Sequence, residues 1–248
     1  NESWKAKQWN VDGKGDKFLM EQRYEGDEDY RLHFDYVKEL FKDKRYVRVN
    51  GRPFFLIYKP GQFNEVKHFM KLWNNWIKEE GIADGIYFVA SIDLQEEKDQ
   101  WLEIGFDAIV PAHRQRIEYS FLQKPKWLRG LVKLKNSLVK RPLIYSMKEF
   151  NMMSPIPSYD GDERVIPFLL PQWDHTPRSG VKGYLVKDST PDEFQKQCAK
   201  MLQLVSRKKN NLVILKSWNE WAEGNYMEPD LKYGKGFINA LITEKNKL

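Results

Sequence analysis

Two glutamates three residues apart, Glu220 and Glu223, are the side chains of this sequence best suited to acid–base chemistry. They lie in the segment 218–224, just after the apolar run 212–215, so they stand at the exit of what reads as a buried strand. Paired carboxylates supply the acid and the base that making or breaking a glycosidic bond requires. Because indole rings offer flat apolar surfaces to sugars, Trp218 and Trp221 beside the pair predict a carbohydrate site.

The spacing of the two glutamates is compatible with joint action on one sugar ring. Residues three apart in a helical first turn point the same way. One ionised carboxylate raises the pKa of its neighbour, which favours an ionised base beside a neutral acid. A simpler alternative is that Glu220 and Glu223 cap or salt-bridge a local turn.

The elements that must position this pair are predicted to alternate between strands and helices. Apolar runs without alternation indicate strands covered on both faces. They occupy residues 54–58, 86–91, 108–110, 143–145, 165–170 and 212–215. Helices are expected at 29–41, 64–77, 192–207 and 236–248, the third opened by Thr190 as cap and Pro191 at its first position. In the first helix Leu32, Tyr36, Val37, Leu40 and Phe41 are expected on one buried stripe, and in the second Val66, Phe69, Met70, Trp73 and Ile77.

Strands that alternate with helices predict a parallel α/β fold. No glycine-rich phosphate loop follows a strand, which disfavours Rossmann and P-loop domains. The long segments after the strands are instead typical of a (β/α)8 barrel, whose active site lies at the carboxyl ends of the strands. Polar and aromatic residues do follow the runs, at Tyr58-Lys59-Pro60, Pro111-Ala112-His113, Gln172-Trp173-Asp174-His175 and the Glu220 segment. Residues 151–164, rich in Pro, Ser, Asp and Gly, are predicted to form a long loop inside the domain.

Composition excludes several classes of protein. No apolar stretch reaches the roughly 18 residues of a membrane span. The single cysteine, Cys198, excludes an intramolecular disulfide and is spaced like a core residue. No His, Cys and acid cluster has metal-ligand spacing, so we expect neither a metal nor a cofactor. The expected location is cytoplasmic, with peripheral membrane association as an alternative, although a start without Met says little about targeting.

The bases behind the net charge of +6 are unevenly distributed. Residues 113–141 contain nine Lys or Arg and one acid, Glu118. They are either solvated helix faces or an attraction for phosphate, in a sugar-nucleotide, a lipid-phosphate carrier or an anionic membrane surface. Nucleic acid is not expected as a partner, since the chain has no helix-turn-helix, zinc-finger or RNP signature.

The C-terminal motif resembles that of the WbsX-type glycosyltransferases, a family related to glycoside hydrolase family 99, the endo-α-mannosidases. The motif reads Trp218-Asn219-Glu220-Trp221-Ala222-Glu223-Gly224, then Glu228-Pro229-Asp230 and Gly234. Further pieces follow the order of the family over nearly the whole chain: Asn1-Glu2-Ser3-Trp4, Glu21-Gln22-Arg23-Tyr24, Asp43-Lys44-Arg45-Tyr46, Gly51-Arg52-Pro53, Gly105-Phe106-Asp107-Ala108, Trp173-Asp174 and Thr176-Pro177-Arg178.

The resemblance implies one (β/α)8 barrel domain and a retaining reaction. Glu220 would be the base on the sugar's own 2-hydroxyl, which attacks the anomeric carbon to form a 1,2-anhydro sugar. Glu223 would protonate the leaving oxygen and later deprotonate the incoming group. Hydrolase and transferase both remain open, with bacterial lipopolysaccharide or surface polysaccharide as the expected setting. The residues expected to bind the substrate are Glu2, Trp4, Tyr58, Trp173, Asp174, Arg178, Trp218, Asn219 and Trp221.

The chain departs from the family pattern at three points. Ser3 and His175 stand where the family usually has Asn, and His175 either bonds a sugar, adds a titrating group or is a neutral exchange. About three strand units that precede the Asn-Glu-x-Trp motif in the family are absent. Residues 1–248 are therefore expected to form a barrel that is incomplete at its N-terminal side, completed by an upstream segment or a second chain. The alternative function is a non-catalytic sugar-binding module or an inactive remnant.

Overall fold

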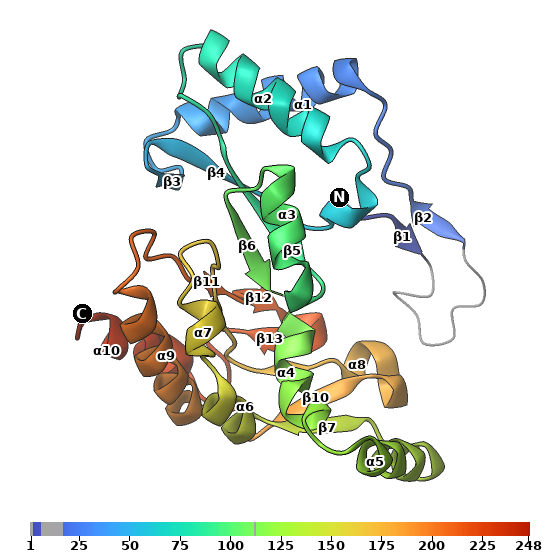
Figure 1. The fold of residues 1–248 in the computed structure, drawn as a ribbon. Helices are drawn as coiled ribbons and strands as arrows, with labels where there is room; N and C mark the ends of the chain where they lie inside the picture. Colours follow the sequence, from blue (N-terminus) through green and yellow to red (C-terminus); the bar gives the residue numbers. More distant parts are fainter. Residues whose placement is uncertain (1, 6–16, 112) are drawn as a thin grey trace. The chain divides into compact units, whose positions relative to one another are not determined.

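The computed structural model describes residues 2–5, 17–111 and 113–248, without the side chains of Tyr119 and Ser120. Asn1 and Ala112, each part of a motif above, lie outside the described residues. The chain divides into two compact units (Figure 1). The described residues of unit 1 are 2–5 and 17–111, and those of unit 2 are 113–248.

Unit 1 is built on a four-stranded sheet in the order β3–β4–β5–β6. Its strands are β3 (Arg48–Val49), β4 (Arg52–Ile57), β5 (Tyr87–Ile92) and β6 (Ala108–Pro111). β4, β5 and β6 run parallel, which confirms three predicted strands, and β3 pairs antiparallel with β4. β6 and all but one residue of β5 are buried, which is why their sequences do not alternate. β1 (Trp4–Lys5) and β2 (Phe18–Met20) form a separate antiparallel pair.

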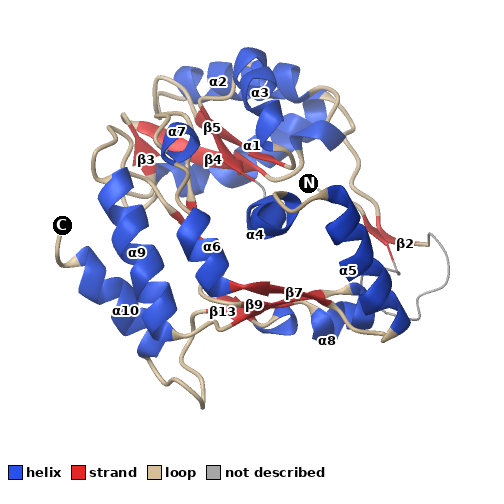
Figure 2. Ribbon diagram, turned by 60° about the horizontal axis from the view of Figure 1, so that its bottom comes forward, coloured by secondary structure: helices blue, strands red, loops and turns tan. Residues whose placement is uncertain are grey.

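The helical elements of unit 1 are α1 (Asp27–Lys42), η2 (Pro60–Gln62), α2 (Val66–Glu79), η3 (Gln95–Glu97) and α3 (Lys98–Ile104). α1 and α2 pack side by side (Figures 1 and 2). α2 buries all five residues predicted for it.

The stripe predicted for α1 is correct for Val37 and Phe41 and wrong for its other three residues. The buried residues of α1 are Tyr30, Phe34, Val37 and Phe41, whereas Leu32, Tyr36 and Leu40 are exposed. Apolar residues occur at helical spacing on two faces of α1, and only one of these faces meets α2. Trp73 of α2 donates its indole N–H to the carbonyl of Tyr30 and packs edge-on against Phe34.

Unit 2 contains short strands in three separate sheets. The strands are β7 (Leu143–Ser146), β8 (Phe168–Leu169), β9 (Trp173–Asp174), β10 (Tyr184–Lys187), β11 (Ile214–Leu215), β12 (Asn219–Glu220) and β13 (Asn225–Tyr226). β10 pairs parallel with β7 and antiparallel with β9, and β11 pairs parallel with β8. β12 and β13 form an antiparallel hairpin. β9, β10, β12 and β13 were not predicted, and β8 and β11 are shorter than the predicted runs.

The helical elements of unit 2 are α4 (His113–Leu122), α5 (Lys126–Leu138), α6 (Met147–Met153), α7 (Pro157–Asp160), α8 (Thr176–Ser179), η4 (Gly180–Lys182), α9 (Pro191–Val205), η5 (Trp221–Glu223) and α10 (Gly236–Lys245). α9 begins as predicted, because the Thr190 side chain accepts the N–H of Glu193 at 3.3 Å. The prediction of a plain loop at 151–164 is wrong, since α6 enters it and α7 lies within it.

Two apolar clusters hold unit 2 together. One lies around β7, β9 and β10 and includes Trp173 and Tyr184. The other lies under α9 and α10, which pack side by side (Figures 1 and 2), and contains Cys198 and Phe237. The sequence correctly predicts a parallel α/β fold, but the described strands form no closed barrel. Among the described helices, none combines the length and apolar composition required to cross a bilayer.

Candidate functional site

The carboxylate pair lies on a small hairpin at the end of β11. β11 pairs parallel with β8. Directly after β11, the backbone N–H of Lys216 donates to the carbonyl of Leu169 at 2.9 Å. The chain then forms β12, η5 and β13, with Asn219 opposite Tyr226 and Glu220 opposite Asn225. The expectation that both glutamates lie in one helical turn is wrong, because Glu220 ends a strand and Glu223 ends a 3-10 turn.

Gly224 brings this hairpin close to β9. It has a left-handed conformation, with φ 51° and ψ 31°, which favours glycine. A Cβ at this position would lie 3.0 Å from the Cβ of Asp174 and 3.3 Å from its backbone nitrogen. The motif glycine thus lets the turn after Glu223 approach the strand that carries Trp173 and Asp174.

Glu223 is held by three donors from β9 and the segment after it. The residue is only 9% exposed. Trp173 donates its indole N–H to one carboxylate oxygen at 3.2 Å, and Arg178 donates to the other. The His175 Nε2 atom lies 3.4 Å from the oxygen that Arg178 binds. The carboxylate is therefore fixed in position and orientation.

The surroundings of Glu223 favour its ionised form. Burial raises the pKa of this carboxyl group, but the hydrogen bond and charge of His175, with the charges of Lys216 and Arg178, outweigh burial. The net effect lowers the pKa of Glu223 to about 2. At neutral pH Glu223 is therefore ionised.

Glu220 has a different environment three residues away. Its side chain is partly exposed, and among the described residues its carboxylate forms no hydrogen bond or ion pair. The two glutamates of this hairpin therefore differ in whether their carboxylates are free to contact a ligand. Glu223 is engaged by the protein, whereas Glu220 is open to accept a proton or a hydrogen bond from a ligand.

Three residues flanking Glu220 lie open on the hairpin. Trp218 and Trp221 are each 48% exposed, and Asn219 is exposed as well. The Trp221 ring stacks on Tyr226 with centroids 3.7 Å apart, and its N–H donates to Glu228 at 2.7 Å. The Trp221 indole is therefore held in place while nearly half of its surface remains accessible for stacking on a sugar.

The other predicted site residues of unit 2 lie around Glu223. Trp173 is buried and Arg178 binds Glu223, so in this structure both position the carboxylate. Asp174 accepts the backbone N–H and the hydroxyl of Thr176, which starts α8. These residues and the hairpin form one cluster, although no contact with a sugar is assigned to any of them.

Two residues of this cluster were not predicted as site residues. The amine of Lys216 lies 4.8 Å from the centroid of the Trp173 ring. Burial lowers the pKa of Lys216, the charges of Glu223 and Glu220 raise it, and Arg178 lowers it, with a net lowering. Burial, with a further contribution from Lys216, lowers the pKa of His113 to about 3, so this imidazole is neutral. Lys216 immediately follows the predicted strand 212–215, and this position was the signal that could have identified it.

His175 is part of the cluster through a ring contact as well. Its imidazole stacks on Tyr184 with centroids 5.4 Å apart and planes inclined by 10°. Its Nδ1 atom is buried without a partner among the described residues. Asn at this position would lack the ring that stacks on Tyr184.

Glu2, Trp4 and Tyr58, the remaining predicted binding residues, belong to unit 1. Trp4 lies on β1 and Tyr58 directly follows β4, and each is a little under half exposed. Glu2 is partly exposed. Their contribution to the site of the glutamate pair stays a prediction.

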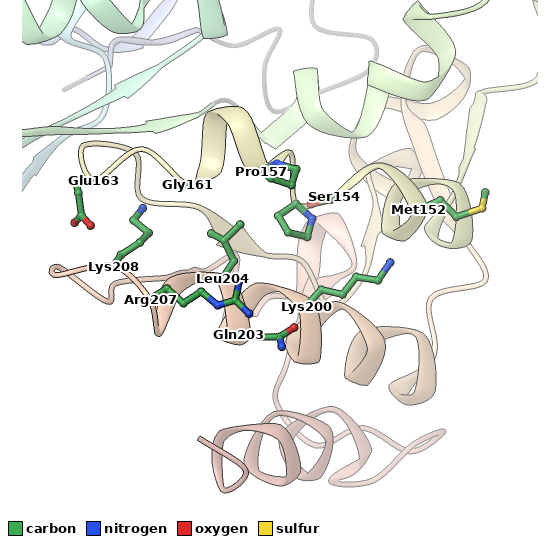
Figure 3. Close-up of a pocket in the computed structure, with 11 residues that line it drawn as sticks. Met152, Ser154, Pro157, Gly161, Glu163, Lys200, Gln203, Leu204, Arg207 and Lys208 are labelled. Atoms are coloured by element: carbon green, nitrogen blue, oxygen red, sulfur yellow. The ribbon is translucent and has the colours of Figure 1, made fainter.

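A cavity of about 540 Å³ elsewhere in unit 2 does not include the glutamate pair (Figure 3). It lies between α9 and the segment of α6 and α7, and Lys200, Arg207 and Lys208 are among its lining residues. The amine of Lys208 donates to the carbonyls of Asp160 and Val165, and that of Lys200 to the carbonyl of Asn151. These lysines tie loops together, so we assign the cavity no chemistry. Across the described residues, no three His, Cys, Asp or Glu side chains form a metal-binding group.

Comparison with solved structures supports the fold. A chain described as a glycoside hydrolase-like protein superposes with a TM-score of 0.55 at 13% identity, covering 87% of this chain and 60% of that one. The GH99 endo-alpha-mannosidase from Bacteroides thetaiotaomicron gives a TM-score of 0.52 at 12% identity, covering 90% and 62%. At such identities the likeness concerns the fold alone.

Sequence comparison identifies the family. Two proteins named "Uncharacterized protein WxcX", from Xanthomonas campestris pv. campestris strains ATCC 33913 and B100, are each 27% identical over 97% of this chain. The chain spans about a third (33%) of the length of these relatives. The family described as Glycosyltransferase WbsX matches residues 1–241. The chain therefore belongs to the WbsX glycosyltransferase family.

Proposed function

We propose that this chain makes or cleaves a glycosidic bond, with Glu220 as the base and Glu223 as the second functional carboxylate. The observation that carries the proposal is the contrast between the two glutamates on one hairpin. Glu220 is accessible and unpaired among the described residues, whereas Glu223 is ionised and held by Trp173 and Arg178. Two half-exposed indole rings beside Glu220 supply surface for a sugar.

Glu220 is suited to deprotonating a sugar hydroxyl. In the scheme that the family resemblance suggests, Glu220 takes the proton of the 2-hydroxyl as that oxygen bonds to the anomeric carbon. The bond from the anomeric carbon to the leaving group breaks in the same step, which leaves a 1,2-anhydro sugar. The acceptor hydroxyl then opens the strained ring at the anomeric carbon as Glu223 accepts its proton and the protonated Glu220 returns its proton to the 2-oxygen. The two inversions together retain the configuration.

The state of Glu223 favours one class of donor. A carboxyl group with a pKa of about 2 cannot protonate a leaving alkoxide efficiently near neutral pH. A nucleoside diphosphate departs as a stable anion and needs no such proton. We therefore favour transfer from a sugar-nucleotide donor, in the assembly of bacterial surface polysaccharide or lipopolysaccharide. Hydrolysis of an α-mannoside-like glycan is the competing reaction and requires ligand binding to raise the pKa of Glu223.

The test is to follow products by mass spectrometry after incubating the protein with sugar-nucleotides plus acceptor glycans, and separately with α-mannosides. Glu220→Gln should lower the rate of product formation by at least about 10²-fold, a typical loss for removing general-base help. Glu39→Gln, on the exposed part of α1, is the matched control and should leave the rate unchanged. Full activity of Glu220→Gln would remove this residue from the mechanism, and glycan binding without turnover would favour a non-catalytic sugar-binding module.

A further inference from the structure

α5 exposes a continuous apolar stripe that the proposed glycosyl chemistry does not use. Trp127, Leu131, Leu134 and Leu138 recur at the spacing of one helical face, and each is between 55% and 75% exposed. No residue of α5 is buried. Exposed apolar residues arranged in such a stripe indicate an interaction surface.

The charges around this stripe all have one sign. Lys126, Arg129, Lys133 and Lys135 lie on the same helix, which has no acidic residue. Among the described residues none of these four forms an ion pair. On a helical projection Lys135 lies beside the stripe on one side, and Lys126 and, farther round, Lys133 lie on the other. An apolar face with basic flanks and a tryptophan is typical of helices that lie in the headgroup layer of a membrane.

The residues around α5 extend the same chemistry. Val132 packs against the core cluster of unit 2, so a different side of the helix attaches it to the protein. Beside α5 lies a cavity of about 450 Å³, whose lining includes the bases Lys124, Lys135 and Arg141 and the apolar side chains of Phe121 and Leu143. From Lys124 to Arg141 the sequence contains no acid. This surface is therefore complementary to phosphates above an apolar layer.

α1 provides an internal comparison. It also exposes apolar residues at helical spacing, Leu32, Tyr36 and Leu40. Its first turn carries three acids, and its bases Arg31 and Lys38 are paired with Asp35 and Glu80. An anionic lipid surface would repel the acidic turn of α1 and attract the unpaired bases of α5.

We infer that α5 is a membrane-docking helix that seats its Trp127–Leu138 stripe in an anionic lipid surface. The charge distribution selects this occupant over a second protein, because a bilayer of anionic lipid offers both the phosphates and the apolar layer. Docking would act on the chain independently of which glycosyl reaction it carries out.

Co-sedimentation with phosphatidylcholine vesicles, with and without phosphatidylglycerol, tests the inference at low and high salt. The protein should bind only vesicles that contain phosphatidylglycerol, and high salt should weaken the binding. Lys126→Gln with Lys133→Gln should lower the partition coefficient roughly 30-fold. Leu131→Gln with Leu134→Gln should lower it at least about tenfold. Leu32→Gln, which changes a leucine that is 71% exposed on α1, should leave it unchanged.

Because the substituted side chains are exposed, each variant should retain the thermal midpoint of the parent protein, which confirms its fold. Absence of binding to anionic vesicles at low salt would overturn the inference. Equal binding to vesicles without phosphatidylglycerol would also overturn it. So would a loss of vesicle binding in Leu32→Gln as large as in the α5 variants. Self-association in sedimentation velocity that Leu131→Gln with Leu134→Gln abolishes, without vesicle binding, would instead identify the stripe as a protein interface.

Discussion

Replacing Glu223 with glutamine separates the structural role of this carboxylate from that of Glu220. The substitution keeps the shape of the side chain but removes the charge that Arg178 and His175 face. The pKa of Glu223 falls from 4.5 to about 2 on folding, and each pKa unit corresponds to about 1.4 kcal/mol. The ionised form therefore contributes about 3 kcal/mol to stability at neutral pH, an order-of-magnitude value.

A folded-state pKa below the unfolded value gives the effect a definite pH window. The contribution is fully present above the unfolded pKa of about 4.5 and is lost as the pH falls through about 2. Glu223→Gln should thus lower the thermal midpoint at pH 7 by roughly 6–12 °C, at about 2–4 °C per kcal/mol for a chain of this size. The difference from the parent protein should shrink steadily between about pH 5 and pH 2.

Scanning fluorimetry at a series of pH values measures the lowering of the thermal midpoint and its dependence on pH. Glu220→Gln is the matched control. Glu220 forms no hydrogen bond or ion pair among the described residues, so its glutamine variant should keep the parent midpoint at pH 7 while losing activity. Equal thermal midpoints for Glu223→Gln and the parent protein at pH 7 would refute the stabilising role that we derive for the ionised Glu223.

Three further predictions concern stability and reactivity. Gly224→Ala should destabilise the protein by about 1–3 kcal/mol, because alanine at φ 51° is strained and its Cβ would meet Asp174 at 3.0 Å. Gly130→Ala in α5, where the new Cβ meets nothing within 4 Å, should instead stabilise the protein by about 0.5–1 kcal/mol. Urea unfolding measures both free energies, and a stabilised Gly224→Ala or a destabilised Gly130→Ala would contradict the prediction. Burial raises the pKa of Cys198 to about 12, so its thiol should react with a disulfide reagent only after unfolding, and rapid reaction in the native state would contradict its core position.

Local physics allowed several elements to be predicted from the sequence. The buried face of α2 and the Thr190 cap of α9 depend on periodicity and on one side chain next to its own backbone. β4, β5 and β6 could be recognised because strands buried on both faces are continuously apolar. The importance of the Glu220 and Glu223 segment was likewise visible in its residue types and spacing, and its family resemblance is confirmed.

The tertiary structure decided what residue identity leaves open. α1 carries two apolar faces, and only the packing of α2 selects the one that contains Tyr30 and Phe34. Glu220 and Glu223 are the same residue type on one hairpin, and sequence spacing cannot distinguish them. The approach of β9 and α8 places Trp173 and Arg178 on Glu223 and leaves Glu220 open. The difference between the two carboxylates thus comes from contacts between segments about 45 to 50 residues apart, which no local pattern encodes.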